Sequence, residues 1–424
     1  MKKLSNYNLF RAFRSKNYSL YFVGRAVSQF GTWMQRTAVV WVVYSITHSP
    51  FLLGLTIFAE TFPSFLFSVF GGVAADRYDR YKVLKITQIS SMIQAVILAA
   101  LVISGHVIIW VIILLSIILG IINAFDVPVR QALVNEVVTD KEDLPNALAL
   151  TTATANLAQL LGPALSGIVL NAFGAGVCFL INAASFGAVM ISLILMTLPA
   201  YIPKIKEKKI MQEFAEGFIY LKQTPEIGLM VVMLALVSLL VLPYNTVIPI
   251  FAKVIFKGNA STFGYINSCV GVGAVTGTIF LASRKAGSNL KKILFITSII
   301  GGIGLIGFSQ IRIFPVAMIF VALAGFGAMA QFTISNITVQ SRSSAEMRGR
   351  AISIVLMAIF GMMPLGSLLV GAVSQRIGAP TTVLCQGIIG LVIAIVFIRF
   401  LLTKPKNTIT NREITEDIIQ EQSA

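Results

Sequence analysis

The charged residues inside the apolar segments of this chain are the ones that could do chemistry. Four polar residues of the first long apolar segment fall in one narrow stripe at the 100° per residue of an α-helix: Arg25, Gln29, Thr32 and Arg36. Even the low estimate for a central arginine that faces lipid is about 2.5 to 3.5 kcal/mol. We therefore expect this stripe to face a water-filled cavity or an acidic partner.

Glu60 is the acid that this stripe predicts. It is the only carboxylate well inside the second apolar segment, and in an antiparallel hairpin its depth comes close to that of Arg36. We predict an Arg36 to Glu60 ion pair. In a cavity of low dielectric constant, protonation of Glu60 would release Arg36, and the substrate could then compete with the proton, as antiport requires. The alternative is a static pair that only orients the two helices.

Other polar residues of the apolar segments are candidates for a substrate cavity. Each could equally be a hydrogen-bonding bridge between helices, which contributes only about 0.6 to 2 kcal/mol. The candidates are Arg25, Gln29, Trp33, Asn123, Asn156 and Gln159 in the first half of the chain and Tyr244, Asn245 and Gln331 in the second.

Membrane-spanning helices must position these residues. Of the 424 residues, 56% are hydrophobic and 12% charged, against about 25% charged in soluble domains. Apolar runs of about 20 residues cross the bilayer core as helices. The sequence predicts an all-α polytopic membrane protein with twelve spans, near 19–46, 51–75, 83–104, 107–134, 145–172, 175–198, 227–252, 262–283, 291–310, 313–340, 350–375 and 379–402.

The net charge of +16 raises the question of a nucleic-acid partner. The basic residues, however, cluster at the N-terminus and between alternate pairs of spans, and the intervening loops carry almost none. By the positive-inside rule, this alternation places both termini in the cytoplasm. The basic residues therefore predict a membrane orientation and no nucleic-acid binding.

The chain is predicted to consist of two six-helix halves, residues 1–198 and 227–402, joined by a cytoplasmic linker, 199–226, and followed by a cytoplasmic tail, 403–424. A shift of 204 residues brings Gly162 onto Gly366 and Gly174 onto Gly378. An even number of spans in each half makes the repeats parallel, which places a solute site between the halves. The alternative is that glycines coincide because the chain has many.

A short loop between the second and third spans carries a motif. Its residues Gly72, Asp76, Arg77, Arg80 and Lys82 resemble the loop motif of the major facilitator superfamily, although Asp79 stands where that motif has its second glycine. We expect Gly72 to let two helices approach closely, and Asp76, Arg77 and Arg80 to lock the cytoplasmic side by pairing with a helix N-terminus or an acid. The alternative is that these residues are only positive-inside anchors.

Asp126 and Arg130, spaced by four, lie in the cytoplasmic third of the fourth span. We predict that Asp126 pairs with the arginines of the short loop as part of the gate. Direct proton transfer by Asp126 is the second interpretation.

Two further stretches sharpen the resemblance. Gly162, Pro163 and Gly167 resemble the superfamily's antiporter signature, in which small residues allow close helix contact and the proline bends the span. Residues 28–36 and 123–136 are similar to the branch that includes bacterial siderophore exporters. The resemblance implies two pseudo-symmetric halves and an alternating-access exporter of the inner membrane, typically driven by protons. A siderophore is the favoured substrate, with a drug or macrolide-like compound or a lipid as alternatives.

An enzyme is not expected. The only histidines, His48 and His106, lie in predicted outer loops far from any acid cluster, and the three cysteines have no paired spacing. We therefore expect no metal and no cofactor, and a monomer whose partners are a small-molecule substrate, protons and lipid.

Overall fold

The computed structural model describes residues 10–197, 210–284, 289–344 and 346–397, whose regular secondary structure is helical throughout. The first six spans are α1 (Lys16–Thr47), α2 (Pro50–Arg77), α3 (Arg80–Ile103), α4 (Ile109–Val137), α5 (Leu144–Phe173) and α6 (Ala175–Leu195). The last six are a broken segment that begins with α8 (Pro225–Leu240), then α10 (Ala260–Ala282), α11 (Leu290–Gln310), α12 (Phe314–Arg342), α13 (Arg348–Ile377) and α14 (Ala379–Val396).

These helices confirm the predicted fold class of twelve spans in two six-helix halves. Eleven of the segments are long and apolar enough to cross a membrane. The twelfth is α1, whose 32 residues extend over about 48 Å, although its polar stripe lowers its hydropathy.

The seventh span is not the continuous helix that we predicted for residues 227–252. After α8 the chain continues as a 3-10 segment (Leu242–Val247), the single turn α9 (Ile248–Ile250) and a π-helical turn (Phe251–Ile255). Pro243 and Pro249 lack the backbone N–H that a continuous α-helix needs. The prolines therefore break this span.

The two halves share a detail that the shift of 204 residues predicts. Gly174 ends α5 with φ of 80°, and Gly378 ends α13 with φ of 84°. An L-amino acid with a side chain rarely adopts this backbone conformation. The same glycine turn therefore joins the fifth span to the sixth in each half.

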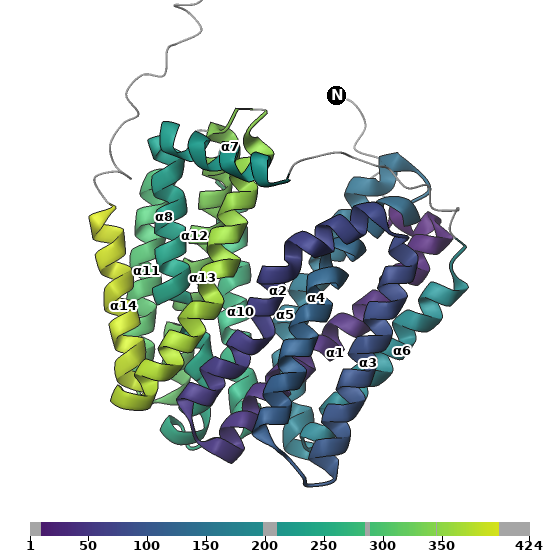
Figure 1. Ribbon diagram of the computed structural model, residues 1–424. Helices are drawn as coiled ribbons and strands as arrows, with labels where there is room; N and C mark the ends of the chain where they lie inside the picture. The colour runs from purple at the N-terminus through teal and green to yellow at the C-terminus, as the bar shows by residue number, and fades with distance from the viewer. Residues whose placement is uncertain (1–9, 198–209, 285–288, 345, 398–424) are drawn as a thin grey trace, which may run out of the picture.

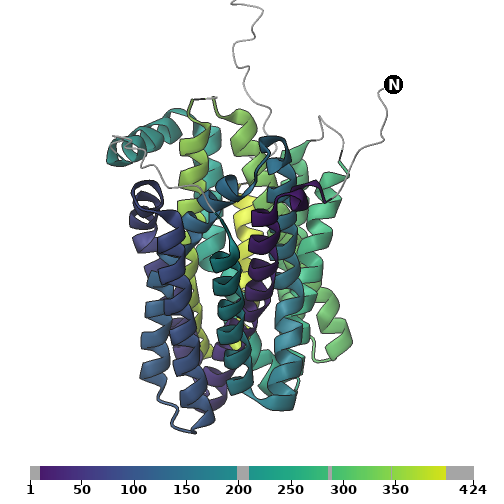
Figure 2. The ribbon, with the colours of Figure 1, turned by 90° about the vertical axis from the view of Figure 1, so that its right-hand side faces the viewer.

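Figures 1 and 2 show α1–α6 in one bundle and α8–α14 in a second bundle beside it. The helix α7 (Ile210–Gln223) lies across one end of the second bundle, which we call the linker end; the opposite end is the far end. Glu216 of α7 pairs with Arg350 of α13 at 2.8 Å, which attaches α7 to the second half. The predicted tail, 403–424, and residues 199–209 of the predicted linker lie outside the described residues.

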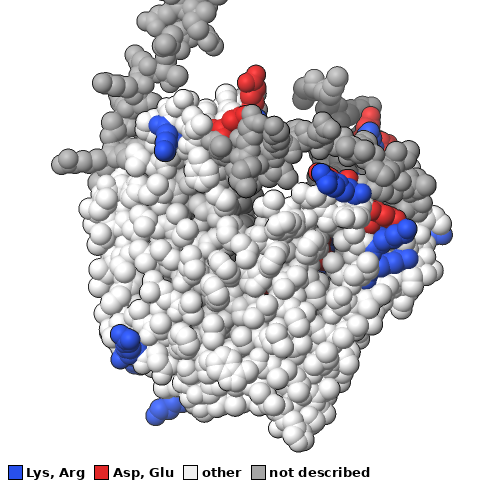
Figure 3. Space-filling model, in the orientation of Figure 1, with Lys and Arg blue, Asp and Glu red and all other residues white. Residues whose placement is uncertain are grey.

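Charged side chains on the visible face gather at the linker end, and the surface below them is almost uncharged down to a few basic residues near the far end (Figure 3). A broad uncharged band is what a bilayer core requires of the surface that it surrounds.

The two halves share one hydrophobic core at the far end. One hydrophobic core there combines residues of both halves, such as Val42 and Phe179 with Phe251 and Phe263. The two cores toward the linker end contain residues of one half each. The surface is hollowed between the halves near the linker end (Figure 3). The described structure is therefore open at the linker end and closed at the far end.

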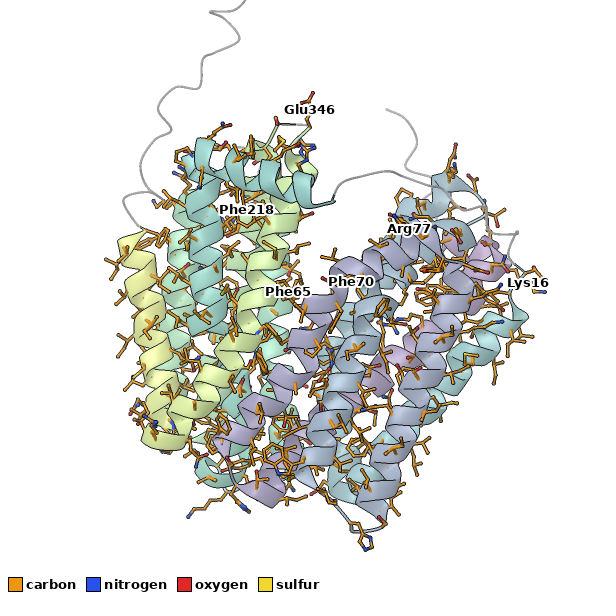
Figure 4. All side chains as sticks on the ribbon, viewed as in Figure 1. Lys16, Phe65, Phe70, Arg77, Phe218 and Glu346 are labelled. Carbon is orange, nitrogen blue, oxygen red and sulfur yellow. The ribbon has the colours of Figure 1, made fainter. Side chains whose placement is uncertain are left out.

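The most extensive contacts between the halves are those of two pairs of helices: α2 with α13, and α5 with α10. Phe65 of α2 lies over Gly361 of α13, where an added Cβ would come 2.8 Å from the Phe65 ring. Toward the linker end, the exposed side chains of Phe70 on α2 and Phe218 on α7 lie on opposite sides of the opening (Figure 4).

Candidate functional site

The Arg36 and Glu60 side chains are in contact between α1 and α2. Arg36 Nε donates to Glu60 Oε1 at 2.7 Å, with 38% of the arginine side chain and 16% of the glutamate side chain exposed. Glu60 lies ten residues after Pro50 and Arg36 eleven before Thr47, which puts the pair about 15 Å from the far ends of both helices. The guanidinium also lies 5.5 Å from the centre of the Trp33 ring. The pair is thus partly accessible and near the middle of the bundle.

Asp126 is buried, and both oxygens of its carboxylate have partners. Its Oδ2 pairs with Arg130 Nη1 at 2.5 Å, and its Oδ1 accepts from Thr87 Oγ1 at 3.0 Å and from Gln88 Nε2 at 2.7 Å. The prediction that Asp126 pairs with the arginines of the short loop is therefore wrong. The reason is local, because Arg130 stands one helical turn away and the two α3 side chains use the other carboxylate oxygen.

Arg80 of the short loop instead pairs with an acid that we had not predicted, Glu136. Arg80 donates through Nε to the carbonyl of Ala75 at 2.7 Å and pairs through Nη1 with Glu136, which lies in the last turn of α4. Asp76 lies 4.0 Å from the same arginine. The sequence does contain the signal, because Glu136 is the only acid in the last turn of the fourth span.

Asp79 stands where the family motif has a glycine, and it caps the N-terminus of α3. Its carboxylate accepts from the backbone N–H groups of Tyr81 at 3.0 Å and Lys82 at 3.4 Å. This is the usual role of an aspartate before the first turn of a helix. Because Asp79 replaces the glycine of the family motif, α3 begins directly after it, at Arg80.

The close helix contact predicted for Gly72 occurs one residue earlier. A Cβ added to Gly71 would come 1.8 Å from the carbonyl oxygen of Ala124 on α4, whereas a Cβ on Gly72 would meet nothing within 4 Å. The prediction for Gly72 is wrong in this respect, because the face of α2 that packs on α4 passes through Gly71.

The antiporter-like segment of α5 contacts both halves. Gly162 lies on Trp33 of α1, where a Cβ would come 2.6 Å from the Trp33 Cβ. Gly167 lies on α10, where a Cβ would come 2.6 Å from the carbonyl oxygen of Ala260. Pro163 lies between them, inside α5. The segment therefore lies where α5 meets α1 and where the first half meets the second.

The predicted cavity residues do not share one cavity. Arg25 and Gln29 line a narrow space in the first half that is too small for a water molecule. Tyr244 and Gln331 line a cavity of about 30 Å³ in the second half. The prediction of a common lining is wrong for these four residues, because each half encloses its own polar side chains.

The remaining candidates lie elsewhere. Trp33 packs under Gly162, and Asn123 is half-buried on α4. Three candidates are exposed: Asn156, Gln159 and Asn245. Asn156 precedes by one turn Leu160, whose carbonyl accepts from Ser268 of α10 at 3.0 Å. Asn156 therefore lies on the face of α5 that is directed toward the second half.

A buried polar network in the first half was also missed. Gln35 donates to Gln94 at 2.9 Å and accepts from Asn182 at 2.8 Å, which links α1 to α3 and α6. Side-chain amides linked across helices stabilise their packing in a membrane. Among the described residues, no group of three or more His, Cys, Asp or Glu side chains is placed to hold a metal ion.

Comparison with known proteins identifies the family. The model of the transmembrane secretion effector family matches residues 8–423. The chain is similar to the staphyloferrin A transporter of Staphylococcus aureus, at 27% identity over 87% of this chain and 92% of that protein. It is 21% identical to macrolide efflux protein A of Streptococcus pyogenes, over 93% and 97%, and 24% identical to the enterobactin exporter of Shigella boydii, over 78% of each.

The fold is that of solved major facilitator transporters. The nucleoside transporter NupG superposes with a TM-score of 0.71 at 15% identity, over 92% of this chain and all of that chain. A bacterial homologue of the human lysosomal transporter Spinster, in its inward-facing and unoccupied conformation, gives a TM-score of 0.69 at 15% identity, over 91% and 97%. The chain therefore belongs to the transmembrane secretion effector family of the major facilitator superfamily and is a multi-pass membrane transporter, not an enzyme.

Proposed function

We propose that the chain is a secondary active exporter of the bacterial cytoplasmic membrane, which exchanges protons for a small organic molecule such as a siderophore by alternating access. The observation that carries this proposal is the contact between Glu60 and Arg36, two opposite charges that meet inside the first half. Charged side chains at membrane depth commonly belong to ion or substrate pathways.

Glu60 is the proposed proton carrier. While ionised it holds Arg36 by a short, charge-assisted hydrogen bond. A proton on Glu60 removes the charge that Arg36 is paired with, so the guanidinium becomes free to move or to bind an anionic group. Binding of substrate and binding of a proton are then linked through one arginine. Asp126 is a second candidate, but Arg130, Thr87 and Gln88 already occupy its oxygens.

The positive-inside rule supports placing the linker end, with both termini, in the cytoplasm. The described structure is then the inward-open state. We propose that residues 1–198 and 227–402 rock as two units about the far-end contact, with 199–226 as linker and 403–424 as tail, and that a monomer suffices. We propose that Asp76, Arg77 and the Arg80 to Glu136 pair form the gate when the linker end closes.

The substrate class rests on the relatives. Two of them are named for siderophores, staphyloferrin A and enterobactin, which favours siderophore export. A macrolide-like compound is the second candidate, because macrolide efflux protein A matches over 97% of its own length.

The test is transport in inverted membrane vesicles that contain the full chain, with a fluorescent reporter of internal pH. A proton gradient, acidic inside, is established and a carboxylate siderophore, a catecholate siderophore or a macrolide is added outside. We expect one of the siderophores to release protons from the vesicles in a protein-dependent way. Proton release with the macrolide alone would select the second candidate, and release with none of the three would reject proton-coupled export of these classes.

Replacing Gly167 by Val is expected to prevent closure of the far end. The new side chain would overlap the Ala260 carbonyl and the Cα of Gly264, which lie 2.6 Å and 3.2 Å from an added Cβ. Since this contact joins the halves, folding of each half should persist while the population shifts toward a state open at the far end. The measurement is the reactivity of a cysteine introduced at Ser268 toward an impermeant maleimide added from outside.

Gly187→Val is the matched control, because a Cβ at Gly187 on α6 meets nothing within 4 Å. Its labelling rate should equal that of the parent. An equal rate in the Gly167→Val variant would show that this glycine does not hold the far end closed.

A further inference from the structure

The broken seventh span contributes to two different hydrophobic cores. Side chains of α8, such as Val237, lie in a core of the second half alone. Side chains beyond the break, such as Ile248 and Phe251, lie in the far-end core that both halves share. The amine of Lys253 also donates to the Ser45 carbonyl of α1 at 3.5 Å. The part beyond the break therefore contacts the first half, whereas α8 packs in the core of the second.

A side chain from a neighbouring helix stabilises the break. Pro243 has no backbone N–H, so the α-helical hydrogen bonds cannot continue through this point. Gln386 of α14 donates through Nε2 to the carbonyls of Leu240 and Val241, at 3.2 Å and 3.3 Å. Backbone carbonyls inside a membrane need such partners from the protein. The end of α8 is therefore held by α14 while the chain beyond it is free of these two contacts.

Two buried polar groups at this level have no protein partner. Tyr244 is 2% exposed and Gln331 of α12 is 7% exposed, and neither side chain makes a hydrogen bond with a described residue. A phenol hydroxyl and a carboxamide can each donate and accept hydrogen bonds. Burying them without a partner is unfavourable. The two groups therefore call for a small polar ligand.

Both groups line one cavity, and its size fits water. The cavity measures about 30 Å³, and about 10–15 Å³ is enough for one water molecule. Ser298 of α11 is a third polar residue of the lining, and its hydroxyl donates to the Leu294 carbonyl at 2.8 Å, so its oxygen can accept. Small residues complete the wall, among them Gly302, Gly327 and Gly390. The cavity is far too small for a drug-sized solute.

We propose that this cavity binds about two water molecules, which hydrogen-bond Tyr244 and Gln331, and that the hydrated break is the hinge at which the far-end part of the seventh span moves against α8. Water can change its hydrogen-bond partners during such a motion, whereas a direct side-chain contact would fix one geometry. Hinges are a few residues at the ends of elements, and 3-10 and π-helical turns often mark them. The hinge rests on the proposed alternating access.

Radiolytic footprinting tests the water. Hydroxyl radicals that form from water bound beside an aromatic ring oxidise that ring, so the full-length protein in nanodiscs is exposed to a short X-ray pulse and analysed by mass spectrometry. We expect oxidation of Tyr244 although it is buried. Tyr18 is the internal control, because it is 0% exposed and its hydroxyl donates to the Ala147 carbonyl at 2.8 Å. Oxidation of Tyr244 no faster than that of Tyr18 would overturn the water site.

The variant Gly390→Ala fills the cavity. Its Cβ would meet only Val241 within 4 Å, at 3.5 Å, so the methyl group enters without a clash. Oxidation of Tyr244 should fall toward the Tyr18 level in this variant and in Gln331→Leu, which removes the amide.

The matched control for both variants is Gly349→Ala on α13, where a Cβ meets nothing within 4 Å. It should leave the oxidation of Tyr244 unchanged. If Tyr244 is oxidised at the parent rate in both Gly390→Ala and Gln331→Leu, the radicals come from bulk water and the site is rejected.

Opening of the far end tests the hinge. In a chain whose native cysteines are replaced, Ser268→Cys is labelled by an impermeant maleimide added at the far end. Ser268 donates to the Leu160 carbonyl across the halves, so labelling reports their separation. Gly390→Ala should slow labelling by about 2- to 30-fold, the range for mutations that alter coupling between sites, and Gly349→Ala should match the parent.

A parent labelling rate in a Gly390→Ala chain that has lost the oxidation of Tyr244 would overturn the hinge. If Gly390→Ala does not fold, Gln331→Leu supplies the same comparison. Footprinting involves no transport, so a failure of export in vesicles would reject the proposed function and leave the water result intact.

Discussion

Replacing Glu60 by Gln is expected to abolish proton-coupled efflux while leaving substrate binding in place. Glutamine keeps the size and a hydrogen-bonding oxygen for Arg36, but it cannot gain or lose a proton. Because no proton can then be carried at this position, the rate of substrate-driven proton release should fall to that of vesicles without the protein. The measurement is the pH-reporting vesicle assay, together with substrate exchange between equal concentrations in the absence of a gradient.

The exchange measurement separates coupling from folding. The Glu60→Gln variant should still exchange substrate, because exchange requires reorientation of the loaded protein and no net proton movement. Glu226→Gln is the matched control: this acid holds Lys291 and Arg342 at 3.1 Å each, at the linker end of the second half, and its loss should leave coupling unchanged.

The double variant Arg36→Glu with Glu60→Arg tests the alternative of a static ion pair. The reversed pair would restore a structural contact between α1 and α2 but would place the titratable group on the other helix. If the pair only orients the helices, both this variant and Glu60→Gln retain coupled efflux once they are folded. That result would remove Glu60 from the mechanism.

Replacing Gly71 by Ala is expected to destabilise the protein severely. The added Cβ would lie 1.8 Å from the Ala124 carbonyl oxygen, and because this oxygen belongs to the backbone of α4, the two helices must separate. Overpacking of this kind typically costs about 1–3 kcal/mol and occasionally more. We expect a lower thermal unfolding temperature in detergent and a lower yield of monodisperse protein.

The neighbouring glycine supplies the control. A Cβ on Gly72 meets nothing within 4 Å, and alanine is favoured over glycine in a helix by about 0.8–1.0 kcal/mol. The Gly72→Ala variant should therefore unfold at the parent temperature or above it. Equal unfolding temperatures for the two variants would contradict the close packing of α2 on α4.

The contact between Arg36 and Glu60 follows from helix periodicity and a short connection between two helices. The stripe of α1 follows from 100° per residue, and the depth of Glu60 follows from the hairpin that joins α1 to α2. Two helices that are adjacent in the sequence must lie side by side, so a short connection limits which residues can meet. The contact at 2.7 Å needed no knowledge of the remaining helices.

The rotation of each helix about its own axis was beyond such reasoning. Asp126 is engaged by Thr87 and Gln88 because of the rotation of α3 against α4, and Gly71 rather than Gly72 meets Ala124 because of the rotation of α2. Successive side chains of an α-helix point in directions that differ by about 100°. A motif therefore marks the loop correctly while leaving open which of two neighbouring glycines is packed.

By itself the sequence determined the spans, their pairing into two halves, and the residues that could carry charge inside the membrane, because bilayer thickness and the cost of buried charge act on every segment separately. The tertiary structure alone decided that Arg25 pairs with no acid among the described residues, that the polar residues divide between two separate spaces, and that the halves share a core at the far end. These features depend on how helices from distant parts of the chain rotate and pack against one another, and that packing is set by many weak contacts acting together.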